Sequence, residues 1–459
     1  MPTFPFEAMI AFGFLSLFLV IGVFLRANIK FFQHFLIPSA LIGGIIGLIL
    51  MMSKIIPVSS SMYETFAYHF FNVSFISLGL AGGNDAGEKR GKEILRGTFW
   101  MSLIEGISFS IQGITGGVLV ILFGLLGIKL FPTFGFFAPL ALEEGPGQSL
   151  SIGKVWEGFG FDHAATIGLS FATLGILLSL FIGVPLVNWG VRKGLAIHAP
   201  KELPQDLLKG IISKGGRKES AGELTMHSGN IETLAFQLSM IGVVYLITYG
   251  IIKLFGLILS TDVESSLWGF FFIIGILVAV TVQTIMKKFG IHYLVDSGIQ
   301  QRITGWSVDY MIASTVMAVQ MVIIWKYIVP ILTIVLISTF LTTIIVVYLG
   351  NRLWSYNLER MVSIYGTVIG IVPTGLLLLR IADPEFRTPA ALELGLCNIM
   401  GAPFIFLGVI ITYAPLWWNW SVGFTVLVYA ILLIIYLYAL HLFHLMGKSV
   451  LTEVNSVTN

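Results

Sequence analysis

The chain has 459 residues, of which 56% are hydrophobic and 11% charged, and its mean hydropathy is +0.92. Ordinary soluble domains are roughly 25% charged, so this composition indicates a polytopic membrane protein. The net charge of +2 is too small to indicate a nucleic-acid partner. The single cysteine, Cys397, excludes an intramolecular disulfide and any metal site built from several cysteines.

Apolar runs that approach or exceed the length needed to cross hydrocarbon predict about eleven transmembrane helices. In the first half we expect them at 7–25, 36–52, 66–80, 98–126 and 164–187. In the second half we expect them at 232–259, 267–285, 310–325, 328–349, 390–413 and 422–445. No stretch shows the alternation of a transmembrane barrel, so the predicted fold is all-α.

Each half also contains an apolar segment that a polar turn interrupts. The first segment, 131–161, breaks at 143–149 (EEGPGQS), and the second, 358–388, breaks at 372–375 (VPTG). In a bilayer, non-helical backbone is tolerated only where protein buries it or where it lines a water-filled cavity. We therefore predict two broken re-entrant hairpins, with a long solvated outer loop as the alternative for the first.

The two breaks reveal an internal repeat. Pro146 and Pro373 differ by 373 − 146 = 227 positions, and the same offset carries the first and fifth expected helices onto the sixth and tenth. The third helix matches poorly. Because five is an odd number, the second half begins on the opposite side of the membrane, which predicts two inverted five-helix repeats. The expected organisation is a first repeat at 1–191, a cytoplasmic linker at 192–231, a second repeat at 232–414, and an extra C-terminal helix with its tail at 415–459.

The loops carry Lys and Arg asymmetrically. With the N-terminus outside, most cations fall in inner loops, including the cluster at 192–218, and the outer face receives only Lys54, Lys129, Lys253 and Lys326. Cytoplasmic loops are enriched in Lys and Arg. The sequence therefore predicts an outer N-terminus and an inner C-terminus.

The first break contains groups suited to an anion. A helix beginning there would present free N–H groups at Gly147, Gln148 and Ser149, which suit a carboxylate. Glu143 and Glu144 precede them, and a charge at helix centre costs at least about 2.5–3.5 kcal/mol on insertion scales. These carboxylates must therefore pair with a cation, take up protons or line an aqueous path.

The second break offers oxygen atoms and a nearby cation. Gly370 and Thr374 supply carbonyl and hydroxyl oxygens, the ligands that a hard cation such as sodium prefers. Arg380 follows within two turns, and its planar guanidinium suits a carboxylate. The alternatives for Arg380 are a structural ion pair with Asp383 or Glu393, or a position at the membrane interface.

Other polar residues lie within expected helices. Glu105 is a candidate functional carboxylate, because ionisable groups inside membranes are usually functional. Glu393 and Asn398 follow the second hairpin and could help to form the site. No phosphate-binding loop or catalytic spacing is present, so the sequence favours no enzyme, and no cofactor is expected. Any energy for transport would come from an ion gradient or a separate partner.

The paired motifs at 144–148 (EGPGQ) and 366–375 (GTVIGIVPTG), the latter continuing to Asp383-Pro384, resemble those of the bacterial sodium:glutamate symporter family. The resemblance implies a homodimeric carrier in the bacterial inner membrane, whose hairpins hold glutamate and sodium and slide, elevator-like, against a fixed scaffold. Known members carry a Gly-Gly-His-Gly-Thr type of turn in the first hairpin, where this chain has Gly145-Pro146-Gly147-Gln148. The extra eleventh helix and the carboxylates Glu143 and Glu144 are further departures.

The leading hypothesis is therefore sodium-coupled uptake of glutamate or a similar small carboxylate. The residues expected to bind the substrate are Gly147, Gln148, Ser149, Thr374, Gly375, Arg380 and Asn398. Those expected to bind sodium are Glu144, Gly145, Gly370, Val372 and Thr374, and the candidate proton or coupling carboxylates are Glu105, Glu143 and Glu144. The alternatives are another organic anion, coupling to protons, and, least favoured, a membrane-embedded enzyme.

Overall fold

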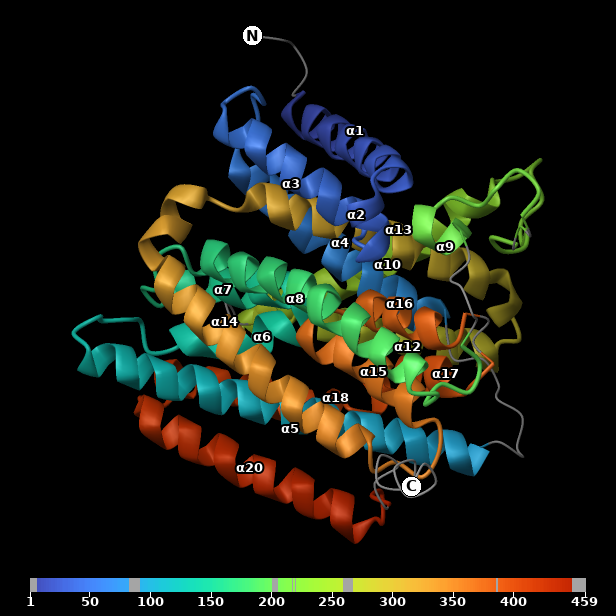
Figure 1. The fold of residues 1–459 in the computed structure, drawn as a ribbon. Coiled ribbons are helices and arrows are strands. Elements are labelled where there is room, and N and C mark those ends of the chain that lie inside the picture. Colours follow the sequence, from blue (N-terminus) through green and yellow to red (C-terminus); the bar gives the residue numbers. More distant parts are fainter. Residues whose placement is uncertain are drawn as a thin grey trace.

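The computed structural model describes residues 6–81, 91–199, 205–216, 218, 220–258, 267–384 and 387–447. Throughout these ranges the regular elements are helices, which agrees with the predicted fold class. The helices form two groups that pack side by side (Figure 1).

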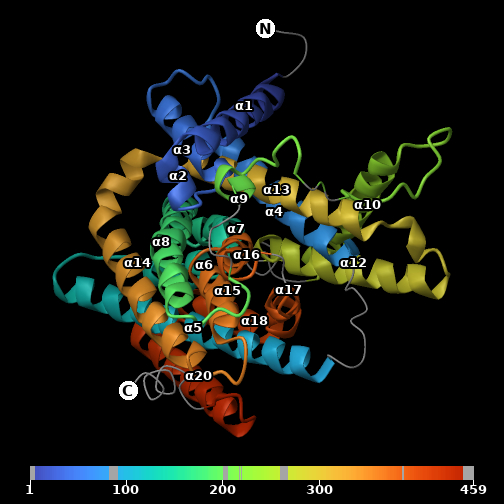
Figure 2. The same ribbon diagram turned by 45° about the vertical axis from the view of Figure 1, so that its right-hand side comes forward.

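The first group is built around α4 (Ser60–Ala81) and α13 (Ser297–Ala318), which pack against each other along much of their length. Around this pair lie α1 (Glu7–Asn28), α3 (Ser39–Met52), α10 (Thr233–Gly256) and α12 (Phe271–Lys288). Figure 2 shows α1 and α3 at one end of the group and α10 and α12 at the other.

Buried amides join the helices of this group. The Ser77 hydroxyl donates to Gln300 Oε1 (2.7 Å), and Gln300 Nε2 donates to Gln237 Oε1 (3.1 Å). Gln237 Nε2 continues to the Leu294 carbonyl (2.9 Å). Interhelical hydrogen bonds of this kind hold helices together where apolar surface alone cannot, because lipid is as apolar as the side chains.

The second group is arranged along α5 (Gly91–Leu125), which packs against α20 (Val422–Leu442) in both views (Figures 1 and 2). Its other long helices are α8 (Ala164–Arg192) and α14 (Met321–Gly350), together with the bent pair α17 (Ala390–Met400) and α18 (Ala402–Thr412). Between them lie two helical hairpins. The first comprises η1 (Phe134–Phe136), α6 (Phe137–Leu142) and α7 (Gly145–Gly158), and the second comprises α15 (Asn357–Ile369) and α16 (Val372–Ala382).

Short elements complete the described chain. They are α2 (Lys30–His34), α9 (Gln205–Lys209), η2 (His292–Leu294) and α19 (Ala414–Trp417). The linker between the expected repeats contains α9, and α10 begins directly after it, where the Glu232 side chain accepts the Ala235 N–H (3.1 Å) and caps the helix.

Seven described helices are long and apolar enough to cross a membrane: α1, α5, α8, α10, α12, α14 and α20. The bent pair α17 and α18 makes an eighth candidate. Of the other three expected spans, α3 is apolar but short, while α4 and α13 carry the polar side chains of the amide network. A polytopic membrane protein is thus confirmed in its coarse form.

The prediction of a helix at 310–325 was wrong. In the structure α13 begins at Ser297 and ends at Ala318, and α14 begins at Met321, so the expected helix straddles the turn between them. The first half of α13 contains the polar residues Gln300, Gln301 and Arg302, so it has no long apolar run to indicate a membrane helix. Its Gln300 is buried in the amide network, and that tertiary contact is what allows a polar segment to be helical there.

Candidate functional site

The first hairpin breaks where the sequence placed the break. Glu143 and Glu144 separate α6 from α7, and α7 begins at Gly145 with Pro146 in its first turn. Gly145 has φ of +83°, a conformation in which a Cβ is unfavourable. Because Pro146 has no N–H and helix starts leave their first donors unbonded, the α7 terminus offers the N–H groups of Gly145, Gly147 and Gln148.

This hairpin is buried inside the protein. Glu143 is 6% exposed, Gln148 is 1% exposed, and all of α6 is buried. The alternative of a solvated outer loop is therefore wrong.

The second hairpin breaks at Gly370 and Ile371, two residues earlier than the motif suggested. The Thr374 hydroxyl accepts the Ile371 N–H (3.0 Å) and lies 2.6 Å from the Gly366 carbonyl, to which it donates. The N–H groups of Thr374 and Gly375 both donate to the Ile371 carbonyl (2.9 and 3.2 Å). At this tip the polar groups are therefore largely bonded to one another, unlike those of the first.

The two tips meet. A Cβ added at Gly145 would lie 2.7 Å from Ile371 Cγ2 and 3.9 Å from the Gly370 carbonyl oxygen. The beginning of α7 and the break before α16 are therefore in contact, although 371 − 145 = 226 positions separate Gly145 from Ile371. This contact brings together the residues expected at 144–148 and at 370–374.

Close backbone packing fixes each hairpin in place. A Cβ at Gly366 would lie 2.7 Å from Gly375 Cα, so the two arms of the second hairpin touch there. A Cβ at Gly175 on α8 would lie 2.7 Å from the Ile369 carbonyl oxygen. Gly375 lies between α15 and α17. In the first hairpin, Gly147 packs against the Phe71 ring of α4.

Unbonded polar atoms gather near the first tip. Both oxygens of Glu143 and both amide atoms of Gln148 are buried with no hydrogen-bond partner among the described residues. The Glu143 carboxyl also interacts electrostatically with Glu144 and Glu105. Buried polar groups are nearly always hydrogen-bonded, so this cluster is suited to contacting a polar ligand.

The remaining expected site residues lie apart from this cluster or are bonded within their own helix. The Ser149 hydroxyl donates to the Gly145 and Pro146 carbonyls (3.1 Å each), and Asn398 Nδ2 donates to the Leu394 carbonyl (3.0 Å). Val372 begins α16, and Arg380 is exposed near its end.

Glu393 is paired with Arg360, not with Arg380. Arg360 Nε and a terminal nitrogen donate to the two Glu393 oxygens (2.7 and 2.6 Å), and both side chains are fully buried. Asp383 instead accepts from the Thr388 N–H and hydroxyl (2.7 Å each). No local pattern in the sequence indicated this pair, because Arg360 and Glu393 are 33 positions apart and lie on different helices.

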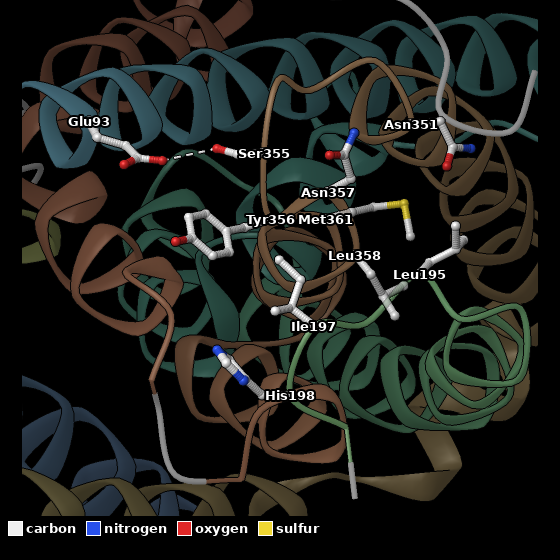
Figure 3. Close-up of a pocket in the computed structure, with 10 residues that line it drawn as sticks. All are labelled: Glu93, Leu195, Ile197, His198, Asn351, Ser355, Tyr356, Asn357, Leu358 and Met361. Atoms are coloured by element: carbon white, nitrogen blue, oxygen red, sulfur yellow. Dashed lines mark hydrogen bonds between the residues drawn. The ribbon is translucent and has the colours of Figure 1, made fainter. Parts of the chain in front are cut away.

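A cavity of about 430 Å³ lies where α15 begins, away from the tips. Figure 3 shows Glu93 bonded to Ser355, with Tyr356, Asn357 and His198 around the opening. Glu93 Oε1 also lies 3.8 Å from Arg360, so this cavity adjoins the buried ion pair.

The described residues hold no group of three or more His, Cys, Asp or Glu side chains placed to bind a metal ion. Any cation at the tips would therefore depend on carbonyl, hydroxyl and single carboxylate oxygens, which suit alkali cations better than transition metals.

Neither a curated protein nor a solved structure gives a significant match to the chain. The family model of the sodium/glutamate symporters matches residues 4–382, which include both hairpins and most of both helix groups. That family consists of membrane transporters, not enzymes, and sodium is its coupling ion. The chain belongs to the sodium/glutamate symporter family.

Proposed function

We propose that this protein takes up glutamate or a similar small carboxylate together with sodium, at the contact between the two hairpin tips. The observation that carries the proposal is the approach of Gly145 to Ile371, beside unbonded buried groups of Glu143 and Gln148. Broken helices that meet inside a transporter commonly form its substrate and ion sites.

The substrate carboxylate would bind at the start of α7. The N–H groups of Gly147 and Gln148 lie there, at the positive end of the helix dipole, and the Gln148 amide can donate a further bond. Thr374, Gly375, Ser149 and Asn398 would contribute only if their present hydrogen bonds rearranged. Arg380 would act as a counter-charge to a second carboxylate.

Sodium would be held by oxygen atoms of the two breaks. The expected ligands are carbonyl and side-chain oxygens of Glu144, Gly145, Gly370, Val372 and Thr374. A cation bound beside the anion lowers the cost of binding the anion, and reciprocally, through a coupling free energy of about 1–3 kcal/mol.

The proposed repeat is supported by the positions of the helices. Adding 227 to α7 (145–158) gives 372–385, which begins where α16 begins, and adding it to α1 (7–28) gives 234–255, which lies within α10. The same offset carries α5 (91–125) to 318–352, which encloses α14, and α8 (164–192) to 391–419, which contains α18 and all but the first residue of α17. The proposed domains remain 1–191, 192–231, 232–414 and 415–459.

An elevator motion would slide the hairpin group along the group built on α4 and α13. The described contacts between the groups are formed mainly by α4 and α13 with α7 and α8. The group built on α4 and α13 would be the fixed scaffold and would form the interface of a homodimer. The protein would lie in a bacterial inner membrane, with its N-terminus outside and its C-terminus inside.

Uptake of labelled glutamate by purified protein in liposomes, with and without an inward sodium gradient, tests the proposal. We expect uptake that requires sodium and that unlabelled glutamate competes. Absence of sodium-dependent uptake would overturn sodium coupling. Competition by another acid but not by glutamate would show that the other acid is the substrate.

Proton coupling is a second candidate, which the environment of Glu143 favours. Its carboxyl is buried, and no described residue forms an ion pair or hydrogen bond with it. A buried carboxylate without a partner is strongly disfavoured relative to its protonated form. Uptake that persists without sodium and collapses with the pH gradient would support this candidate.

A further inference from the structure

The helix formed by α17 and α18 is broken near its middle, apart from the two hairpins. The two parts are bent by 47°. At the junction the Gly401 N–H donates to the Cys397 carbonyl (2.6 Å), and the Phe404 N–H donates to the Gly401 carbonyl (2.8 Å). The Met400 carbonyl lacks its usual helical partner, the Phe404 N–H, because that N–H bonds to Gly401.

Glu105, from the middle of α5, points at this break. Its Oε1 accepts a hydrogen bond from the Cys397 thiol (3.2 Å), and its Oε2 lies against Gly401, where a Cβ would collide with it. The side chain is 4% exposed, and Oε2 is buried with no partner among the described residues. A buried carboxylate oxygen without a partner among the described residues thus lies at the helix break, against Gly401.

The charges around this junction favour a bound cation. Among the described residues, the ion pairs of Lys154 and Arg360 involve Glu64, Glu93, Glu157 and Glu393, and Glu105 takes part in none of them. The neighbouring carboxyls Glu143 and Glu144 interact unfavourably with it. The last carbonyls of α17 form the negative end of a helix dipole. A carboxylate and helix carbonyls together attract a small cation, as broken helices do in other transporters.

We propose that Glu105 Oε2 and the carbonyl oxygen of Met400 bind one sodium ion at the break between α17 and α18, separate from the site at the hairpin tips. This inference rests on the proposed sodium symport and adds a second ion position to it. The polar face of α5 links the two positions, because Gln112, two turns from Glu105, donates to the Val368 carbonyl near the second tip (2.8 Å).

The reactivity of Cys397, the only cysteine of the chain, can be used to monitor this position, because its thiol is hydrogen-bonded to Glu105. We would measure the alkylation rate of Cys397 by N-ethylmaleimide in purified full-length protein. The comparison is between sodium and N-methylglucamine at equal ionic strength and fixed pH, without glutamate. We expect saturating sodium to slow alkylation at least fivefold, since a bound ion holds Glu105 and the α17 terminus together.

Glu105→Gln keeps an oxygen that accepts from the thiol but removes the charge. We expect this variant to lose the sodium effect on alkylation. Ser110→Ala is the matched control, because Ser110 lies on the same helix and bonds only its own backbone, at Gly106 (2.8 Å). It should keep the sodium effect. A sodium effect that survives in Glu105→Gln, or none in the unmodified protein, would overturn the site.

Glutamate uptake measured on the same preparation separates this inference from the proposed function. If uptake requires sodium while Cys397 alkylation ignores it, the second ion position is wrong and the symport stands. If sodium protects Cys397 while uptake ignores sodium, the cation site stands and sodium-coupled uptake is wrong.

Discussion

Arg360 and Glu393 form a two-point ion pair between α15 and α17, with N–O distances of 2.7 and 2.6 Å and no exposure of either side chain. Arg360 also donates to the Ser355 carbonyl and hydroxyl (2.9 Å each), so its guanidinium is bonded on both sides. The pair fastens the second hairpin to the helix that follows it.

Removing one partner of this pair should destabilise the protein strongly. Arg360→Met or Glu393→Leu leaves a buried charge unpaired, which costs about 3–5 kcal/mol. The double variant removes both charges and should be much closer to the unmodified protein in thermal unfolding. A double variant as unstable as the sum of the single variants would contradict a role for the charges.

Gly145→Ala should separate the hairpin tips. An alanine there combines a left-handed backbone, which costs about 1–2 kcal/mol, with a Cβ 2.7 Å from Ile371 Cγ2. We expect uptake to fall about tenfold while the protein still folds. Ile371→Ala in the same chain should restore part of the loss by removing the colliding methyl.

Gly158→Ala at the other end of α7 is the control, because nothing lies within 4 Å of its added Cβ. Equal uptake loss in both alanine variants would mean that the tip contact is not what matters.

Gln148→Leu should impair glutamate binding without lowering the stability of the protein. The buried amide atoms have no partner among the described residues, and a buried unbonded polar group costs about 1–3 kcal/mol. Leucine removes that cost, so thermal stability should hold or rise, while the KM for glutamate should rise at least about tenfold. An unchanged KM would remove Gln148 from the substrate site.

Lys154 and Glu64 join the two helix groups, with 2.6 Å between Nζ and Oε2. Lys154 lies on α7 and Glu64 on α4, so a sliding motion would have to break this bond. Because Lys154 is half exposed, we expect Glu64→Gln to weaken the contact by at most about 1 kcal/mol and to change the rate of glutamate exchange up to about fivefold.

Lys154→Met should change exchange in the same direction as Glu64→Gln, and the double variant should add little. Glu157→Gln removes only the partner on Lys154's own helix, at 3.2 Å, and should affect exchange less. Additive effects of the two substitutions would show that the pair does not act as a unit.

Arg380 should be tested by charge and by shape. If it anchors a substrate carboxylate, Arg380→Gln raises the KM for glutamate about tenfold. Arg380→Lys then raises it less, because lysine keeps the charge and loses the planar guanidinium. An unchanged KM in both variants removes Arg380 from the site.

The sequence by itself determined the membrane class, the two breaks and most helix positions. Long apolar runs and turns containing Gly and Pro act locally, so the break at 143–149 was recognisable without a fold, and the break before 372–375 was recognisable to within two residues. The sequence-based prediction misplaced α13. The polar first half of this helix is stabilised by buried partners such as Ser77 and Gln237, which lie on other helices.

Only the tertiary structure decided which distant groups meet. Gly145 against Ile371, Arg360 with Glu393, and Glu105 at Gly401 join positions far apart in the chain, and no local pattern encodes such pairs. The tertiary structure also distinguishes Glu105 from Glu143, two carboxylates that the sequence presented as equivalent candidates. One is bonded to Cys397 and the other has no bonded partner among the described residues. That difference depends on what packs around each group, which is a property of the fold.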